Sequence, residues 1–327
     1  MRAPDFVVSP SRDDLHAAAA RLAPHVRRTP IMEIDGNELG TKARVVLKLE
    51  LLQHTGSFKA RGALNTLLTR EVPPGGVVAA SGGNHGAAVA WAAGRAGVPA
   101  QVFVPATSPP VKARRIAGYG ADVVVVDGYY PDALAASREW AAERPAGRAV
   151  TEVHAYDAPE VVAGQGSLGL ELADQIPDAD QVLVSCGGGG LFAGVALALD
   201  GGPEVLPVEP VHCRTLAAAL AAGGPVQGEV GGVAADSMGA ATAGRIAYAV
   251  AASRGISPPL VPDDAIVAAR EFLWERCRIL AEPGGATAFA SLFCGAVRPE
   301  AGTTVVVVVS GGNTLEVPGS GAASPEV

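Results

Sequence analysis

Short apolar runs rich in β-branched residues alternate along the chain with alanine-rich segments of helical length. Continuous apolar runs are typical of strands that are covered on both faces, as in parallel sheets. Strands that alternate with helices in this way predict an α/β fold. We expect strands at Arg44–Leu49, Gly76–Ala80, Ala100–Val104, Asp122–Val126, Gln181–Val184, Glu204–Val208 and Thr303–Val309.

The segment from Asp263 to Leu280 has the pattern of an amphipathic helix. Pro262 followed by two aspartates is a helix start signal. Apolar side chains then recur at helical spacing on one face, which is therefore expected to be buried. These side chains are Ile266, Ala269, Leu273, Cys277 and Leu280.

The predicted strands fall into two sets along the sequence. One set lies between about Gly76 and Thr151, and the other lies mostly after His154. We expect a small domain at residues 74–151, inserted into a large domain formed by residues 1–73 and 152–327. Each domain should hold a mostly parallel sheet flanked by helices, and a cleft between two such domains is a common ligand site.

Composition and charge narrow the class of protein. The chain has 327 residues, of which 49% are hydrophobic, as expected for a globular enzyme. A formal net charge of −8 argues against nucleic acid and anionic membrane as partners. No apolar run reaches the ~18 residues of a membrane-spanning helix.

The ends and the cysteines agree with a cytoplasmic protein. The segment Met1–Pro10 lacks the apolar core of a signal peptide, and Pro318–Val327 is expected to be a frayed tail. The cysteines have no CxxC spacing, so reduced thiols are expected. They are Cys186, Cys213, Cys277 and Cys294.

The first candidate for chemistry is Lys59, in the segment Gln53–Ala63 (QHTGSFKARGA). Hydroxyls and glycines surround this lysine at the point where a strand gives way to a helix. A primary amine in such a place becomes a Schiff-base nucleophile if removal from water lowers its pKa. The alternative is an ordinary surface lysine.

A second candidate is the loop Ser81–Gly86, which follows one predicted strand and opens an alanine-rich helix. Backbone N–H groups at a helix start bind anions such as a carboxylate, and glycines let the ligand approach closely. Asn84 adds an amide with donors and an acceptor. The alternatives are a glycine turn capped by Asn84 and a structural role for His85.

A third candidate is the loop Ser185–Leu191, which holds four consecutive glycines between a strand and a helix. Such a loop is a candidate phosphate cradle, because its backbone N–H groups converge on the ligand. A flexible turn is the alternative, although a buried strand rarely needs four glycines only to turn.

The same region permits a dinucleotide-binding interpretation. Gly187, Gly189 and Gly194 loosely follow the dinucleotide fingerprint, and Glu209 lies about twenty residues further on, where a ribose-binding acid belongs. On spacing alone an NAD-linked oxidoreductase is credible. However, the glycine spacing is not that of the fingerprint, and this interpretation leaves the Lys59 and Asn84 segments unexplained.

A fourth feature is Ser310, which ends the strand Thr303–Val309 and begins a Ser-Gly-Gly-Asn run. Ligands of α/β sheets bind at the carboxyl ends of strands. Ser310 is therefore placed to offer a hydroxyl to a ring nitrogen or a polar substrate atom. A serine that only opens a glycine turn is the competing interpretation.

Five separated motifs, taken together, resemble the fold-type II pyridoxal-phosphate enzymes, in the serine/threonine dehydratase and serine racemase branch. The resemblance extends from about Leu15 to Glu316. The motifs are Gln53–Ala63, Ser81–Gly86, Gly187–Leu191, Glu282–Ala286 and Ser310–Asn313.

The resemblance implies pyridoxal 5'-phosphate as the cofactor and a role for each matching residue. Lys59 would bind the cofactor covalently and move the substrate Cα proton. Phe58 would lie against the pyridine ring, Asn84 would bond its 3-hydroxyl, Ser310 would face its nitrogen, and Glu282 would tune the ring.

The resemblance also assigns the residues that hold the phosphate and the substrate. The cofactor phosphate would be held by Gly187, Gly188, Gly189, Gly190 and Leu191. The substrate carboxylate and the cofactor edges would be taken by Ser57, Ser81, Gly83 and His85. Asp236–Ala240 would contribute to the substrate pocket.

The reaction implied is β-elimination of a β-hydroxy amino acid such as L-threonine or L-serine, which gives a 2-keto acid and ammonia. Racemases of the branch carry a serine as second base two positions before the loop asparagine, where this chain has Gly82. Racemisation and β-replacement, as in the cysteine synthases, are the alternatives within the fold. The substrate itself stays open among serine, threonine, 3-hydroxyaspartate and phenylserine.

The remaining expectations concern cations, regulation and assembly. Some members of the branch bind a cation through an acid that Glu209 matches, but Thr215 stands at the third ligand position and is a poor ligand for a hard cation. We therefore expect no metal site, with a monovalent or divalent cation at Glu209 as the alternative. We expect a homodimer acting on a small amino acid, without a regulatory domain after Ser310.

Overall fold

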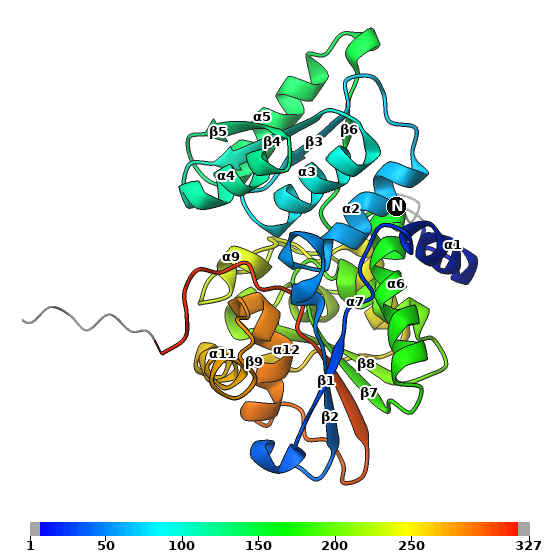
Figure 1. Cartoon of the computed structure of the whole chain (residues 1–327), viewed down its shortest axis with the longest axis vertical. Helices are drawn as coiled ribbons and strands as arrows, with labels where there is room; N and C mark the ends of the chain where they lie inside the picture. Colours follow the sequence, from blue (N-terminus) through cyan, green and yellow to red (C-terminus); the bar gives the residue numbers. More distant parts are fainter. Residues whose placement is uncertain (1–6, 320–327) are drawn as a thin grey trace, which may run out of the picture.

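The computed structural model describes residues 7–319, which form two sheets flanked by helices (Figure 1). The predicted α/β class is therefore confirmed. The helices of at least eight residues are α1 (Arg12–Leu22), α2 (Lys59–Thr69), α3 (Asn84–Ala96), α4 (Pro110–Gly118), α5 (Tyr130–Ala142), α6 (Pro159–Gln175), α7 (Gly190–Ala198), α8 (Thr215–Ala222), α10 (Arg245–Ser253), α11 (Asp263–Cys277) and α12 (Pro283–Phe293). A single helical turn, α9, spans Ala235–Met238.

The larger sheet has six strands in the order β1-β2-β10-β7-β8-β9. Only β1 is antiparallel to its neighbour, and the other pairs are parallel. The strands are β1 (Ile31–Ile34), β2 (Arg44–Lys48), β7 (Gln181–Ser185), β8 (Glu204–Pro210), β9 (Leu260–Val261) and β10 (Thr304–Val308).

Both faces of this sheet are covered by helices, as its continuous apolar strands require. On one face Val305 and Val307 of β10 belong to a buried cluster with α11 and α12. On the other face Val306 and Val308 join α6, α7 and α10. The carboxyl ends of the central strands therefore open toward the second sheet.

The smaller sheet is fully parallel, in the order β5-β4-β3-β6. Its apolar side chains contact α2, α3 and α4 on one face and α5 on the other. The strands are β3 (Val77–Ala80), β4 (Ala100–Pro105), β5 (Asp122–Val126) and β6 (Thr151–Glu152). We propose the two sheets as the cores of the two expected domains, although the expected boundary after residue 151 falls inside β6.

The seven predicted strands are confirmed to within two residues at each end. The sequence analysis missed β1, β6 and β9, which have four, two and two residues and contain no long apolar run. The expectation that one helix continues to Leu280 was wrong, because Arg278 adopts a left-handed conformation at φ 54° and ends α11 at Cys277.

Residues 1–6 and 320–327 lie outside the described part of the chain. Most of Met1–Pro10 and nearly all of the expected tail Pro318–Val327 therefore cannot be compared with the structure. Within residues 7–319, no helix combines the length and the apolar character that crossing a bilayer needs.

A buried group of charges fastens α2 to the larger sheet. The guanidinium of Arg61 donates to both carboxylate oxygens of Glu50, at 2.8 and 2.9 Å, and to Glu171 at 2.8 Å. Lys48 on β2 donates to the same Glu171 at 2.8 Å and to the carbonyl of Thr29 at 2.8 Å. The side chains of Arg61, Glu50 and Lys48 are fully buried, so two cations and two anions balance one another inside the protein.

Arg61→Ala should lower the free energy of unfolding by about 3–5 kcal/mol, because it leaves Glu50 buried without its cation. Chemical denaturation measures the change. Arg44→Ala is the matched control, since Arg44 pairs with Glu33 and Asp178 at the surface. A change of about 1 kcal/mol or less is expected for that control. Equal effects of the two substitutions would show that the buried pairs do not stabilise α2.

Candidate active site

Lys59 is the first residue of α2, the helix that packs against α3 beside the smaller sheet and α6 beside the larger one. The chain enters this helix through a tight turn in which Thr55 and Gly56 have φ values of 62° and 75°. The Lys59 ammonium donates to the carbonyl of Ala155 at 2.6 Å and lies 5.2 Å from the centre of the Phe58 ring. Burial without a carboxylate partner lowers the pKa of Lys59 to about 8. The neutral form of this amine is therefore far more accessible near physiological pH than that of an ordinary lysine, whose pKa is about 10.4.

The loop after β3 presents the first turn of α3 to the same space. Ser81 accepts a hydrogen bond from the N–H of Gly83 at 3.1 Å, which fixes the loop. The first helical backbone bond of α3 runs from the N–H of Ala87 to the carbonyl of Gly83, at 3.2 Å. The preceding N–H groups of the helix remain available to an anion.

The ring of His85 has a structural role. Its Nε2 donates to the carbonyl of Val153 at 2.9 Å, which ties α3 to the segment that follows β6. Burial first, and then the nearby charge of Lys59, lowers the pKa of His85 to about 3. The ring therefore stays neutral at physiological pH, and only the backbone of His85 is free to meet a substrate.

The four-glycine loop leads directly into α7, and Gly189 holds a left-handed conformation at φ 85°. The ring of Tyr156 packs against Gly188, where a β-carbon would lie 2.4 Å from the ring. The carbonyls of Gly187 and Gly188 accept bonds from Thr215 and Gly244, at 2.9 and 3.0 Å. The backbone N–H groups in the first turn of α7 have no acceptor within that helix, and free donors of this kind are what a phosphate needs.

Glu282, Asn84 and Ser310 meet where the two sheets face each other. The amide of Asn84 donates to Glu282 at 2.6 Å, and the hydroxyl of Ser310 donates to the carbonyl of Gly284 at 3.4 Å. Burial raises the pKa of Glu282 to about 7, so this carboxyl is partly protonated near neutral pH. The structure thus brings together three residues that lie far apart in the sequence.

The structure adds three residues that had no role in the sequence analysis. Asn313 and Arg115 lie beside Asn84, and Tyr156 lies beside Gly188. The amide of Asn313 donates to the carbonyl of Thr55 at 2.8 Å and to the side chain of Asn84. Arg115 of α4 donates in turn to Asn313 and, at 3.4 Å, to Thr55. Asn313 belonged to a quoted motif, whereas Arg115 and Tyr156 gave no local signal, because their neighbours are distant in sequence.

The donor and acceptor groups of this site fit pyridoxal phosphate. The hydroxyls of Ser57 and Thr55 are buried and have no hydrogen-bond partner within the described residues. A buried polar group without a partner costs about 1–3 kcal/mol, so such groups are expected where a ligand supplies the partner. The desolvated amine of Lys59 matches the cofactor aldehyde, and the N–H groups of the glycine loop match its phosphate. The two hydroxyls match a carboxylate.

The features that suggested a dinucleotide or a cation have other partners. Both carboxylate oxygens of Glu209 accept backbone N–H groups at the start of α8, from Leu216 at 2.7 Å and Ala217 at 2.8 Å. Gly194 lies where α7 meets α6, and a β-carbon there would come within 2.5 Å of the carbonyl of Val162. Among the described residues, no group of three or more metal-ligating side chains is present.

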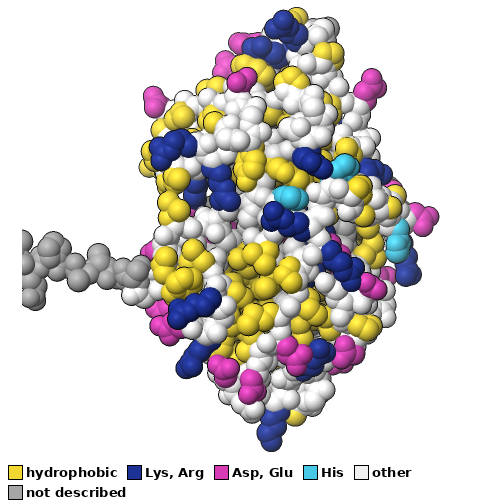
Figure 2. Space-filling view, viewed as in Figure 1, with side chains coloured by type: hydrophobic (Ala, Val, Ile, Leu, Met, Phe, Trp, Pro, Cys, Tyr) yellow, Lys and Arg dark blue, Asp and Glu magenta, His cyan; other side chains and the backbone are white. Residues whose placement is uncertain are grey.

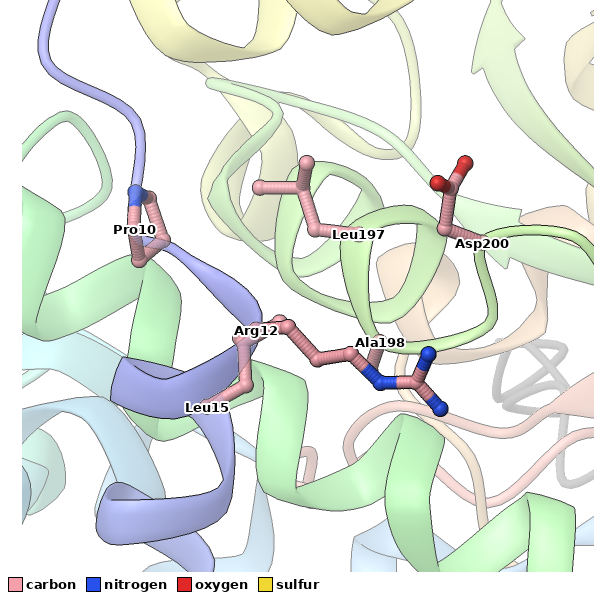
Figure 3. Close-up of a pocket in the computed structure, with 6 residues that line it drawn as sticks. All are labelled: Pro10, Arg12, Leu15, Leu197, Ala198 and Asp200. Atoms are coloured by element: carbon pink, nitrogen blue, oxygen red, sulfur yellow. The ribbon is translucent and has the colours of Figure 1, made fainter.

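One cavity lies away from this cluster. It has a volume of about 140 Å³ and lies between the start of α1 and the end of α7 (Figure 3). Arg12 and Asp200 lie at this cavity together with apolar side chains. None of the predicted site residues lines it.

Comparison with known proteins agrees with this geometry. Residues 22–311 match the model of the family described as pyridoxal-phosphate dependent enzyme. The L-threonine ammonia-lyase of Geobacter sulfurreducens is 36% identical over 304 residues, which are 91% of this chain and 74% of that protein.

Solved structures give the same result. A threonine deaminase from T.th. superposes with a TM-score of 0.85 at 35% identity, over 94% of this chain and 100% of that one. Maize serine racemase also gives a TM-score of 0.85, at 30% identity over 94% of both chains. The dinucleotide interpretation is therefore set aside, and the chain belongs to the fold-type II pyridoxal-phosphate enzymes, in the serine/threonine dehydratase branch.

Proposed function

We propose that this enzyme deaminates a β-hydroxy amino acid, such as L-threonine or L-serine, to a 2-keto acid and ammonia. The observation that carries the proposal is a desolvated amine, Lys59, in a fold where α3 and α7 begin with glycine loops whose backbone N–H groups suit an anion. The threonine ammonia-lyase and threonine deaminase names of the similar proteins support the same reaction.

Each candidate residue has a definite task in this reaction. When bound, pyridoxal phosphate supplies an electron sink that makes the substrate Cα proton acidic. The N–H groups of Gly187, Gly188, Gly189, Gly190 and Leu191 would hold its phosphate. Asn84, Ser310 and Phe58 would hold and orient its ring.

The substrate carboxylate would lie at the start of α3, near Ser57, Ser81 and the backbone of Gly83 and His85. The free amine of Lys59 then takes the Cα proton, a transfer that is typically worth ~10²–10⁴-fold in rate. A pKa of about 8 suits this role, because the neutral base forms without strongly alkaline conditions. Glu282, which accepts a hydrogen bond from Asn84, is partly protonated near neutral pH, and this lowers the negative charge of the buried cluster.

Elimination is favoured over racemisation by the lack of a side chain at position 82. A β-carbon on Gly82 would lie 2.1 Å from the hydroxyl of Ser108, so that space is already filled. Position 82 therefore offers no group that could return a proton from the face opposite Lys59. The neutral hydroxyl of Ser310 favours prompt loss of the β-hydroxyl, because it does not stabilise a positive charge on a ring nitrogen.

We also propose that the enzyme is a cytoplasmic homodimer. Its four cysteines are free thiols, as in a reducing compartment. Figure 2 shows hydrophobic side chains gathered on the face of the larger domain. The exposed apolar residues of that domain include Ile31, Leu52, Val267, Phe293 and Leu315, and an exposed apolar patch is typical of a subunit interface.

Purified enzyme should release pyruvate from L-serine or 2-ketobutyrate from L-threonine, with one ammonia for each keto acid. A lactate dehydrogenase-coupled assay measures the keto acid, and chiral chromatography measures D-serine. We expect little D-serine, since only Lys59 is placed to move the Cα proton. D-serine as the main product would instead support racemisation.

The reaction of cofactor-free protein with pyridoxal phosphate should occur at Lys59, and its rate should rise with pH and level off above about 8, where the amine is neutral. An ordinary lysine would need a pH above about 10. Borohydride trapping at each pH, followed by peptide mass spectrometry, locates and times the reaction. Lys59→Ala should stay colourless, whereas labelling of another lysine at the same rate would remove Lys59 from its role.

Multi-angle light scattering should give about twice the 32.8 kDa mass of one chain. Leu52→Glu places a charge at an exposed apolar residue of the larger domain and should shift this mass toward that of the monomer. Val125→Glu, at an exposed site on β5, is the control. A monomer at all concentrations would contradict the proposed dimer.

A further inference from the structure

Two cationic side chains of α4 line a small cavity beside the loop Ser81–Gly86, which is called the substrate loop below. Lys112 and Arg115 lie one helical turn apart and face Gly82, Gly83 and Asn84 of that loop. Asn313 and the apolar side chains of Ala87 and Ile116 complete the wall. No carboxylate is among the lining residues.

Arg115 has only uncharged acceptors among the described residues. It donates to the side-chain oxygen of Asn313 and to the carbonyl of Thr55. A guanidinium carries five N–H donors, so further donors remain for a ligand. A bond from this cation to an anion is stronger than a bond to a neutral oxygen, which gives an anionic group an advantage at this position.

Lys112 adds to the positive character of the cavity. Its one ion pair is with Asp236, whose side chain is 71% exposed, whereas the Lys112 side chain is only 20% exposed. Water screens the exposed carboxylate more than the half-buried ammonium. Arg115 is exposed as well, so water also screens its charge. Two cations face the carboxylate of Asp236 and the partly protonated Glu282, which leaves a modest positive balance at the loop Ser81–Gly86.

The size of the cavity limits what can enter it. Its volume is about 30 Å³, about two to three times the space that one bound water needs. A small group such as a methyl or a carboxylate therefore has room to enter. The two cations then favour a carboxylate over a methyl, because they attract the negative charge of the carboxylate and have no such attraction for a methyl.

We propose that Arg115, assisted by Lys112, binds a second carboxylate carried on the substrate β-carbon, so that the preferred substrate is a 3-hydroxy amino dicarboxylic acid such as 3-hydroxyaspartate. This inference rests on the proposed elimination reaction. The cavity shares Gly83 and Asn84 with the loop that would take the α-carboxylate. The two carboxylates of one small substrate would thus lie on neighbouring surfaces.

The overall chemistry balances without a further reactant. Lys59 takes the Cα proton, the bond from the β-carbon to its hydroxyl breaks, and one proton and this hydroxyl leave together as water. The β-carbon of the resulting enamine then takes up a proton that the nitrogen gives up, and one water replaces nitrogen at Cα, which releases ammonia. 3-Hydroxyaspartate gives oxaloacetate and ammonia with no net oxidation or reduction.

Binding of L-malate to the holoenzyme tests the inference independently of turnover. L-Malate carries both carboxylates but no amine, and 2-hydroxybutyrate carries a methyl in place of the second carboxylate. Isothermal titration calorimetry should show malate binding at least tenfold more tightly than 2-hydroxybutyrate. Arg115→Gln should reduce this ratio at least tenfold, and Lys112→Gln should reduce it by a smaller factor.

Arg114→Gln is the matched control, because Arg114 lies on the same helix but does not line the cavity. Its malate preference should stay within twofold of that of the unsubstituted enzyme. In activity assays, Arg115→Gln should lower the ratio of kcat/KM for 3-hydroxyaspartate to that for threonine at least tenfold. An equal loss for both substrates would overturn the inference, since Arg115 would then only position Asn313.

The outcomes separate this inference from the proposed function. Keto-acid release from threonine without any preference for malate would overturn the second-carboxylate site and leave the elimination reaction standing. A malate preference that depends on Arg115, without keto-acid release from any β-hydroxy amino acid, would support the site and reject elimination.

Discussion

The buried pairing of Arg61 with Glu50 and Glu171 is the interaction on which the active site depends. Arg61 lies two residues after Lys59 on α2, so the position of the guanidinium fixes the start of the helix and hence the amine. The same helix packs against α3 of the small sheet and α6 of the large one. Buried charges are tolerated only when each has its partner, and this requirement gives α2 a single position between the two sheets.

Burial around Lys59 favours the uncharged forms of the ionisable side chains. Burial shifts the pKa values of Lys59, His85 and Glu282 toward their neutral forms. Negative groups of a ligand would be met by backbone N–H groups at the starts of α3 and α7. Backbone donors hold an anion without adding a charged side chain to the site. The cationic side chains of α4 lie at the edge of this arrangement, where they affect the choice of substrate more than the proton transfer.

The contrast between Glu209 and Lys59 shows how far local patterns can be interpreted. Glu209 stands where a ribose-binding acid or a cation ligand was considered, yet both of its oxygens cap α8. Nothing in the sequence around Glu209 indicates this, because the donors belong to a helix that begins after an intervening turn. Lys59 lies in a dense motif of small and hydroxyl residues, and such a motif constrains the local backbone strongly enough to be interpreted without the fold.

The sequence by itself determined the α/β class, the seven strands with continuous apolar runs, the lysine and glycine motifs, and the family. These features follow from periodicity and from short motifs, which act through neighbours along the chain. Only the tertiary structure decided that Asn313 joins Asn84 to Thr55, that Ala155 accepts the bond of Lys59, and that Arg115 faces the substrate loop. It also decided the short strands β1, β6 and β9, whose pairing depends on neighbouring strands. These contacts join residues that are remote in sequence, and their energies exist only once the two sheets have packed around α2.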